Sequence, residues 1–160
     1  MKAITLYQPY AELMALGIKT RETRHCRIKY RGDICIHAAL RQPVMTFHQR
    51  DALRVRGINP NARFVRGAIV AVVELYDCIP AGAAADEARA FGEWEFGDYR
   101  EFRWAYLTQN LRRLPGPVFC AGMQSICWEV EAEIAEAVKE QLRLSGEKQG
   151  RRSCERGRPE

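Results

Sequence analysis

The chain opens with alternating apolar and polar positions over residues 2–6, and this period of two predicts a strand. Residues 8–17 follow as a predicted short helix, since Pro9 suits a first helical turn and Gly17 suits a helix exit. We predict an extended segment over 19–24, because Thr20 and Thr23 are β-branched and the polar positions form no helical face. The start of the chain is therefore a strand, a short helix and a second strand.

The middle of the chain is dominated by strand patterns. A turn at 30–33 precedes a buried strand over 34–39, and the apolar positions of 43–55 are compatible with a helix that ends at Gly57. Residues 67–77 are apolar at odd and even positions, so both faces of this strand should be covered. A short helix near 86–90, a strand over 103–107 that can continue to 114, and a turn at 115–117 follow.

The end of the chain divides into a helix and a polar segment. Ile134, Val138 and Leu142 stand at i, i+4 and i+8, which predicts a helix over 131–144. Residues 145–160 are poor in apolar side chains and rich in Gly, Arg and Glu, so we predict a disordered basic tail after a single domain over 1–144. Several short strands with a few helices predict an α+β fold, a small β-barrel flanked by helices.

The composition adds three limits. The formal net charge is +5, which is compatible with nucleic-acid binding and equally with a solvated surface. The six cysteines form no CxxC pair, so we expect neither a disulfide framework nor a metal or cofactor site. No apolar stretch approaches the ~18 residues of a membrane span, and the start does not resemble a signal peptide, so a cytoplasmic location without a membrane partner is expected.

The candidate chemistry is concentrated in a short charged stretch and one isolated acid. Residues 17–24 read Gly-Ile-Lys-Thr-Arg-Glu-Thr-Arg and carry Lys19, Glu22 and Arg24. Glu74 lies inside the apolar run 68–76, where burying a carboxylate is costly unless it has a partner or a function. Lys19 and Arg24 are candidate partners of Glu74, and together these residues would form a charged cleft in an apolar setting.

Several segments in order resemble one family. The pattern Gly-x-Lys-x-x-Glu-x-Arg after a short helix is similar to the signature of the ASCH domain, a member of the PUA-like superfamily. Residues 4–10, 36–39, 67–77 and 103–106 also match, and the Gly-Met-Gln-Ser-Ile-Cys-Trp of 122–128 looks like the family's late Gly-x-Gln-x-x-x-Trp segment. The resemblance covers roughly residues 1 to 130. It implies a PUA-like barrel of five to six mostly antiparallel strands, with a cleft beside the first helix.

The resemblance implies two classes of function for that cleft. Family members are proposed to bind RNA or nucleotides there, and one bacterial branch hydrolyses the amide of N4-acetylcytidine. Lys19 matches the lysine of that branch and Glu74 its strand glutamate, but Glu22 stands where the branch has a threonine nucleophile. The covalent mechanism therefore does not transfer. A metal-independent amidohydrolase would instead use Glu74 to activate water, Lys19 to stabilise the oxyanion and Glu22 to position water or the leaving amine. Ribonuclease activity is a further alternative that no motif here selects.

The binding alternative uses a wider set of side chains. Candidates for contacting RNA or a modified nucleoside are Gln8, Tyr10, Lys19, Arg24, His37, Trp104 and Gln124. Aromatic rings can stack on bases and amides can read base edges, whereas the same residues can equally be core aromatics, backbone caps, a structural arginine and a satisfied barrel histidine. Residues that could track phosphates on the rim are Arg21, Arg27, Lys29 and Arg31. The pattern indicates no oligomeric state.

Overall fold

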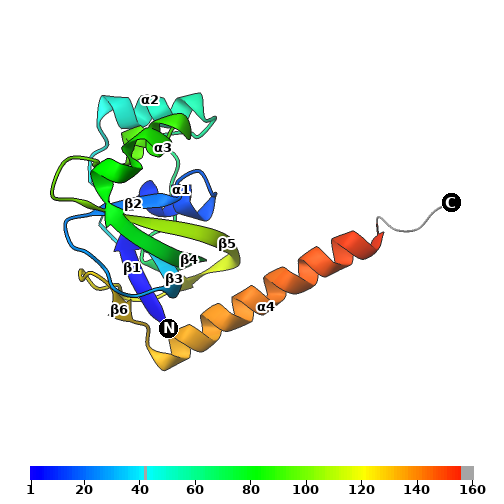
Figure 1. Ribbon diagram of the computed structural model, residues 1–160. Helices are drawn as coiled ribbons and strands as arrows, with labels where there is room; N and C mark the ends of the chain where they lie inside the picture. Colours follow the sequence, from blue (N-terminus) through cyan, green and yellow to red (C-terminus); the bar gives the residue numbers. More distant parts are fainter. Residues whose placement is uncertain (42, 156–160) are drawn as a thin grey trace.

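Six strands form one mostly antiparallel sheet (Figure 1). The computed structural model describes residues 1–41 and 43–155, the last ten of them as backbone. The strands are β1 (Lys2–Leu6), β2 (Arg21–Arg24), β3 (Gly32–Ala38), β4 (Ala68–Pro80), β5 (Trp104–Phe119) and β6 (Trp128–Glu129). Their order is β2-β5-β4-β3-β1-β6, with β1 and β3 parallel. The α+β class with six mostly antiparallel strands is confirmed, and the sheet is open, with β2 and β6 at its two ends.

Four α-helices lie around the sheet. They are α1 (Tyr10–Ala15), α2 (Phe47–Val55), α3 (Ala85–Ala90) and α4 (Ala132–Glu155), and two 3-10 turns, η1 (Ala81–Ala84) and η2 (Trp94–Phe96), flank α3. In Figure 1, α2 and α3 lie together at one end of the molecule, whereas α4 starts near the N-terminus at the other end and runs away from the sheet. Within the described part of the chain, no helix is long and apolar enough to cross a membrane.

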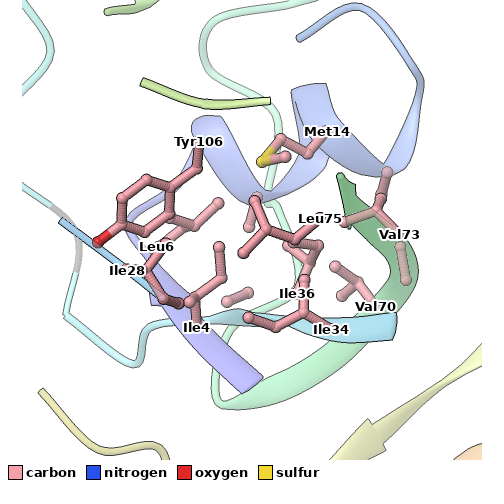
Figure 2. Close-up of a cluster of buried hydrophobic side chains, with 14 of the residues drawn as sticks. Ile4, Leu6, Met14, Ile28, Ile34, Ile36, Val70, Val73, Leu75 and Tyr106 are labelled. Carbon is pink, nitrogen blue, oxygen red and sulfur yellow. The ribbon is translucent and has the colours of Figure 1, made fainter. Parts of the chain in front are cut away.

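The main core lies between α1 and one face of the sheet (Figure 2). Ala11, Met14 and Ala15 of α1 are buried there against residues of β1, β3 and β4. Apolar residues of the sheet meet this helix because side chains on a strand alternate between its two faces. Tyr106 of β5 closes the cluster, fully buried, and donates a hydrogen bond to the Cys26 carbonyl at 2.7 Å.

The first turns of α4 pack on the opposite face of the sheet, before the helix runs away from it. Val138 of α4 is completely buried in a second cluster with Val72 of β4 and with Leu114 and Val118 of β5. The prediction that both faces of the strand at 67–77 are covered is therefore confirmed. This sandwich fixes β4 in the middle of the domain and leaves the two ends of the sheet available for a site.

The clearest difference from the sequence prediction is β5. Residues 115–117, Pro-Gly-Pro, do not form a turn between elements but lie inside this 16-residue strand. Ile69 pairs with Val118 and Ala71 pairs with Arg113, so the prolines fall in a bulge of the β4–β5 ladder. A proline can occupy a bulge because the ladder needs no N–H donor there. The turn predicted at 115–117 is thus wrong.

The helices also differ in length from their predicted ranges. The first helix is shorter than 8–17, and α4 continues past residue 144 to Glu155. The predicted boundary between a domain over 1–144 and a disordered basic tail over 145–160 stays a prediction. Its last five residues, 156–160, lie outside the described residues, and the side chains of 146–155 are not described.

Candidate functional site

A buried row of charges runs along β2. The Lys19 side chain is fully buried, and its Nζ lies 3.1 Å from Glu22 Oε2 and donates to the Arg21 carbonyl. The other carboxylate oxygen, Glu22 Oε1, accepts from Arg24 Nε at 3.0 Å. One carboxylate is therefore shared by two cations, as buried charges require if they are to be neutralised. The structure therefore brings together three members of the predicted charged cleft, Lys19, Glu22 and Arg24.

Arg24, at the end of this row of charges, lines a pocket. Its Nη2 donates to the Thr5 carbonyl of β1 at 2.5 Å, while its Nε is held by Glu22. The third nitrogen of Arg24, Nη1, donates to no acceptor among the described residues. β2 is an end strand and β1 lies next to the other end strand, so Arg24 bridges the open side of the sheet. We call this opening the seam.

The seam contains a pocket of about 380 Å³. Its lining residues come from β1, β2 and β5, from the residues that directly follow β1, β2 and β3, and from the segment before β6. They are Thr5, Tyr7, Arg24, His25, Cys26, Ala39, Tyr106, Gln124, Ser125 and Ile126. The Gln124 side-chain amide donates a hydrogen bond of 3.5 Å to the Tyr7 hydroxyl. The pocket thus combines a guanidinium, an amide, a hydroxyl and aromatic rings, the composition of a small-molecule site.

A second hollow adjoins the seam pocket. It has a volume of about 660 Å³, and it shares Thr5, Ala39 and Gln124 with the seam pocket. His37 and Gly122 line its wall. The shared residues place the two hollows side by side along the seam, and we call them together the seam groove.

His37 is fixed by its burial in this wall. Its Nε2–H donates to the Cys120 carbonyl at 3.2 Å, and its ring meets Trp128 edge-on at 5.7 Å. Burial lowers the pKa of His37, and the hydrogen bond to Cys120 offsets part of this effect. Nδ1 is buried without a hydrogen-bond partner among the described residues. The neutral ring therefore presents an unused acceptor beside Gly122, at which a Cβ atom would overlap the imidazole.

Five of the seven predicted binding residues do not line the seam pocket. Lys19 is buried beside Glu22 and His37 lines the adjoining hollow, while Gln8, Tyr10 and Trp104 lie elsewhere. Gln8 is completely buried, donates to the Val65 carbonyl at 2.6 Å and accepts from Glu12 N at 3.0 Å, so it caps α1. Tyr10 accepts a hydrogen bond from Gln49 and lines a different hollow beside η2. The Arg27 guanidinium covers the Trp104 ring at 5.2 Å. These side chains have structural partners, which is the alternative that the sequence left open for them.

Glu74 is the main correction to the predicted cluster. Its carboxylate accepts from Gln109 at 3.1 Å and from Asn110 at 2.5 Å, and none of the ion pairs of the described residues involves it. The adjacent Leu75 lies in the main core with Tyr106, so Glu74 points to the other face of the sheet. Glu22 is paired directly across from Tyr106 and lies on the inner side. The structure therefore does not bring Glu74 to Lys19, Glu22 or Arg24.

The predicted phosphate-tracking residues also separate. Arg21 is buried and ion-paired with Glu93 at 2.9 Å and with Glu87 at 2.5 Å, so it fastens β2 to the segment around α3. Arg31 is paired with Asp77 at 2.9 Å. Arg27 and Lys29 are exposed. The prediction that Arg21 lies on an open rim is wrong.

Some residues of the site were missed by sequence reasoning. Thr5 accepts a hydrogen bond from Trp128 Nε1 at 3.1 Å and donates to the Met123 carbonyl at 2.9 Å, so it holds the late segment against β1. Ser125 and Ile126 line the pocket. The available signal was a polar residue, Thr5, in an otherwise mostly apolar strand, two positions before Tyr7.

In the part of the chain that the structure describes, no three His, Cys, Asp or Glu side chains are grouped as metal ligands would be.

Comparison with known proteins gives a family and a fold. The family model described as the ASCH domain matches residues 4–141. No curated protein matches the chain. Among solved structures, crystal structures of ASCH from Zymomonas mobilis are similar. The unmutated Zymomonas protein shares 15% sequence identity with this chain and superposes with a TM-score of 0.53. The match covers 84% of this chain and 90% of the Zymomonas chain.

Two variants of the Zymomonas protein give the same picture. Its tyrosine-to-phenylalanine mutant is 12% identical with a TM-score of 0.53, covering 87% of this chain and 96% of that chain. Its serine-to-alanine mutant is 15% identical with a TM-score of 0.54, covering 87% and 94%. Identities this low show a shared fold alone.

Proposed function

Because the chain belongs to the ASCH domain family, we propose that its seam pocket binds one nucleobase, presented by RNA or by a modified nucleoside. The observation that carries this proposal is the position of Arg24. Glu22 and the Thr5 carbonyl hold two of its nitrogens, so the guanidinium is oriented before any ligand arrives. An oriented fork is suited to bidentate hydrogen bonding with a base edge or a phosphate.

The other lining groups complete a base-sized site. The volume of about 380 Å³ suits a ligand of nucleoside size. Gln124 offers an amide that both donates and accepts, and the Tyr7 ring at the pocket wall offers a surface for stacking. Stacking of a base on an aromatic side chain contributes about 1–3 kcal/mol. Unpaired bases of single-stranded RNA can be splayed into such a pocket, whereas bases inside a duplex cannot.

The test measures binding of nucleoside monophosphates and of short single-stranded RNA by the purified protein, using calorimetry and fluorescence anisotropy. Gln124→Ala and Arg24→Lys should each weaken binding of both ligands about tenfold, because each removes a hydrogen bond worth about 1.4 kcal/mol. The matched control is Gln109→Ala, an exposed glutamine that binds Glu74 away from the seam. Unchanged affinity in both seam variants would refute the proposal.

The enzymatic alternatives stay predictions. An amidohydrolase that uses Lys19, Glu22 and Glu74 would require these side chains to act on one substrate. Glu74 lies on the other face of the sheet from Glu22, and Lys19 has no exposed side-chain surface. Neither this alternative nor a ribonuclease is favoured by a specific observation. Release of acetate from N4-acetylcytidine and cleavage of the labelled RNA can be followed in the same samples.

A further inference from the structure

The positive charge of the chain is concentrated in one segment. Residues 40–66 contain six arginines and a single acid, Asp51, so this segment alone carries a formal charge of +5. The whole chain has a formal net charge of +5, so the other residues are neutral in sum. A local excess of this kind creates a field that attracts a polyanion.

These arginines differ in their partners from most of the described arginines elsewhere, Arg27 over the Trp104 ring being an exception. Arg24, Arg31 and Arg113, for example, are ion-paired with acids of the sheet and of α1. None of the ion pairs formed by the described residues includes a member of 40–66. Arg41, Arg63 and Arg66 are exposed. Their charge is therefore available to an anion in solution.

The arginines gather around a concave surface. Arg50, Arg63 and Arg66 line a hollow of about 680 Å³ beside α2, together with Phe64. Arg50 donates to the Asn61 side chain at 2.6 Å, which orients it without neutralising it. We call Arg41, Arg50, Arg63 and Arg66 the arginine face. The Phe47 side chain is 72% exposed at the start of α2, so an open aromatic ring comes from the same segment.

The arginine face lies beside the seam groove. Arg41, Leu40 and Gly67 line the part of the groove beside His37. Arg66, which lines the arginine hollow, directly precedes Gly67, and its guanidinium reaches the Leu40 carbonyl at 3.5 Å. A ligand that leaves the seam pocket through the groove therefore arrives at unneutralised guanidinium groups.

We propose that the arginine face binds the phosphodiester backbone of single-stranded RNA whose base occupies the seam pocket, so that the ligand is an oligonucleotide rather than a free nucleoside. This inference rests on the proposed function of the pocket. A charged groove combined with accessible aromatic rings is the arrangement that binds single strands. Arg66 links the arginine hollow to the groove, since its guanidinium donates to the Leu40 carbonyl, so a chain that follows this path fits better than a flat lipid surface.

The experiment compares a labelled single-stranded RNA 10-mer with a nucleoside monophosphate. The test variant Arg50→Gln/Arg63→Gln/Arg66→Gln should lose about 10- to 100-fold in affinity for the 10-mer. The slope of log affinity against log salt should fall by about 2, since each phosphate contact with a single strand contributes about 0.7. Binding of the monophosphate should be unchanged. The control Arg89→Gln/Arg100→Gln/Arg143→Gln removes the same charge from exposed side chains elsewhere.

Each outcome separates the two proposals. Suppose that Gln124→Ala lowers the affinity for both ligands, but the test variant binds the 10-mer as tightly as the control variant does. The proposed role of the arginine face is then refuted, and the proposed role of the pocket stands. If the test variant has lost affinity for the 10-mer while Gln124→Ala leaves the affinity for both ligands unchanged, base binding in the seam pocket is refuted. Capture of anionic phosphatidylserine vesicles without affinity for RNA would overturn the assignment to RNA. The single variant Arg63→Glu, at an exposed position, repeats the test should the triple variant unfold.

Discussion

Replacing Glu22 by Gln tests the reading of the buried charges most directly. Glu22 is the single acid that the structure pairs with both Lys19 and Arg24. Glutamine keeps the shape but loses the charge, and it turns one acceptor into a donor. The buried Lys19 ammonium then has only neutral acceptors, the Arg21 carbonyl and the new amide oxygen, and no negative charge beside it. We expect a strongly destabilised protein that still folds at low temperature.

The size of the effect follows from distance and burial. Opposite charges 3.1 Å apart attract by about 5 kcal/mol at an effective dielectric constant of ~20. Removing one partner of a buried pair costs about 3–5 kcal/mol, because the other charge stays buried and unpaired. Lys19→Met should cost less than Glu22→Gln, since it leaves the Glu22–Arg24 pair intact and puts an unbranched apolar chain in the same space. The double variant should be more stable than Glu22→Gln alone.

The assay is urea unfolding followed by tryptophan fluorescence, with thermal melting alongside. A loss of 3 kcal/mol lowers the Tm by about 6 °C or more in a domain of this size. The control is Glu136→Gln, which removes the acid of the exposed Lys139–Glu136 pair and should change the free energy of unfolding by no more than about 0.5 kcal/mol. If Glu22→Gln is no less stable than this control, or if Lys19→Met is the more damaging change, the shared carboxylate does not neutralise the cluster.

Four further predictions follow from other parts of the molecule. Gly122→Ala should lower the affinity for RNA, measured by anisotropy, because the new methyl group overlaps the His37 ring and displaces the segment that carries the pocket amide. Since the pKa of His37 is lowered in the folded state, the stability that its neutral form contributes is complete above about pH 6.5 and is lost as the pH falls toward the folded pKa. Melting temperatures from pH 7 to 5 should therefore fall less steeply in His37→Gln. Val138→Ala should cost about 2 kcal/mol in urea unfolding, because it empties part of the core under α4. Thr46→Ala should cost about 1 kcal/mol, because it removes the capping box that Thr46 forms with Gln49, and a Ser substitution should restore the loss.

The parts of the fold that depend on local pattern were predictable. The strand at 2–6 has the predicted bounds, and the apolar run of β4 is covered on both faces as its composition requires. The path of β5 through Pro115 and Pro117 was not predictable, because a bulge depends on the partner strand. The length of α4 was missed for a related reason, since residues beyond 144 offer no apolar stripe to mark a helix.

The candidate site divides in the same way. Lys19, Glu22 and Arg24 lie close in sequence, in β2 and just before it, so their spacing was enough to predict the cluster. The position of Glu74 depends on the face of β4 that it occupies, and the bulges in the β4–β5 ladder change that face along the strand. Thr5 and Tyr7 meet Gln124 only because the sheet stays open between β2 and β6. No local pattern encodes that opening.

The position of β1 has a consequence for how the chain reaches its native state. β1 lies between β3 and β6, and the Lys2–Glu129 contact joins residues 127 positions apart. Contacts between such distant residues raise the contact order and slow folding. During synthesis on the ribosome, the β3 side of β1 can pair early, whereas its other edge stays unpaired until β6 has been made. A chaperone that shields exposed strand edges would therefore act on this protein mainly in the interval before its last strand emerges.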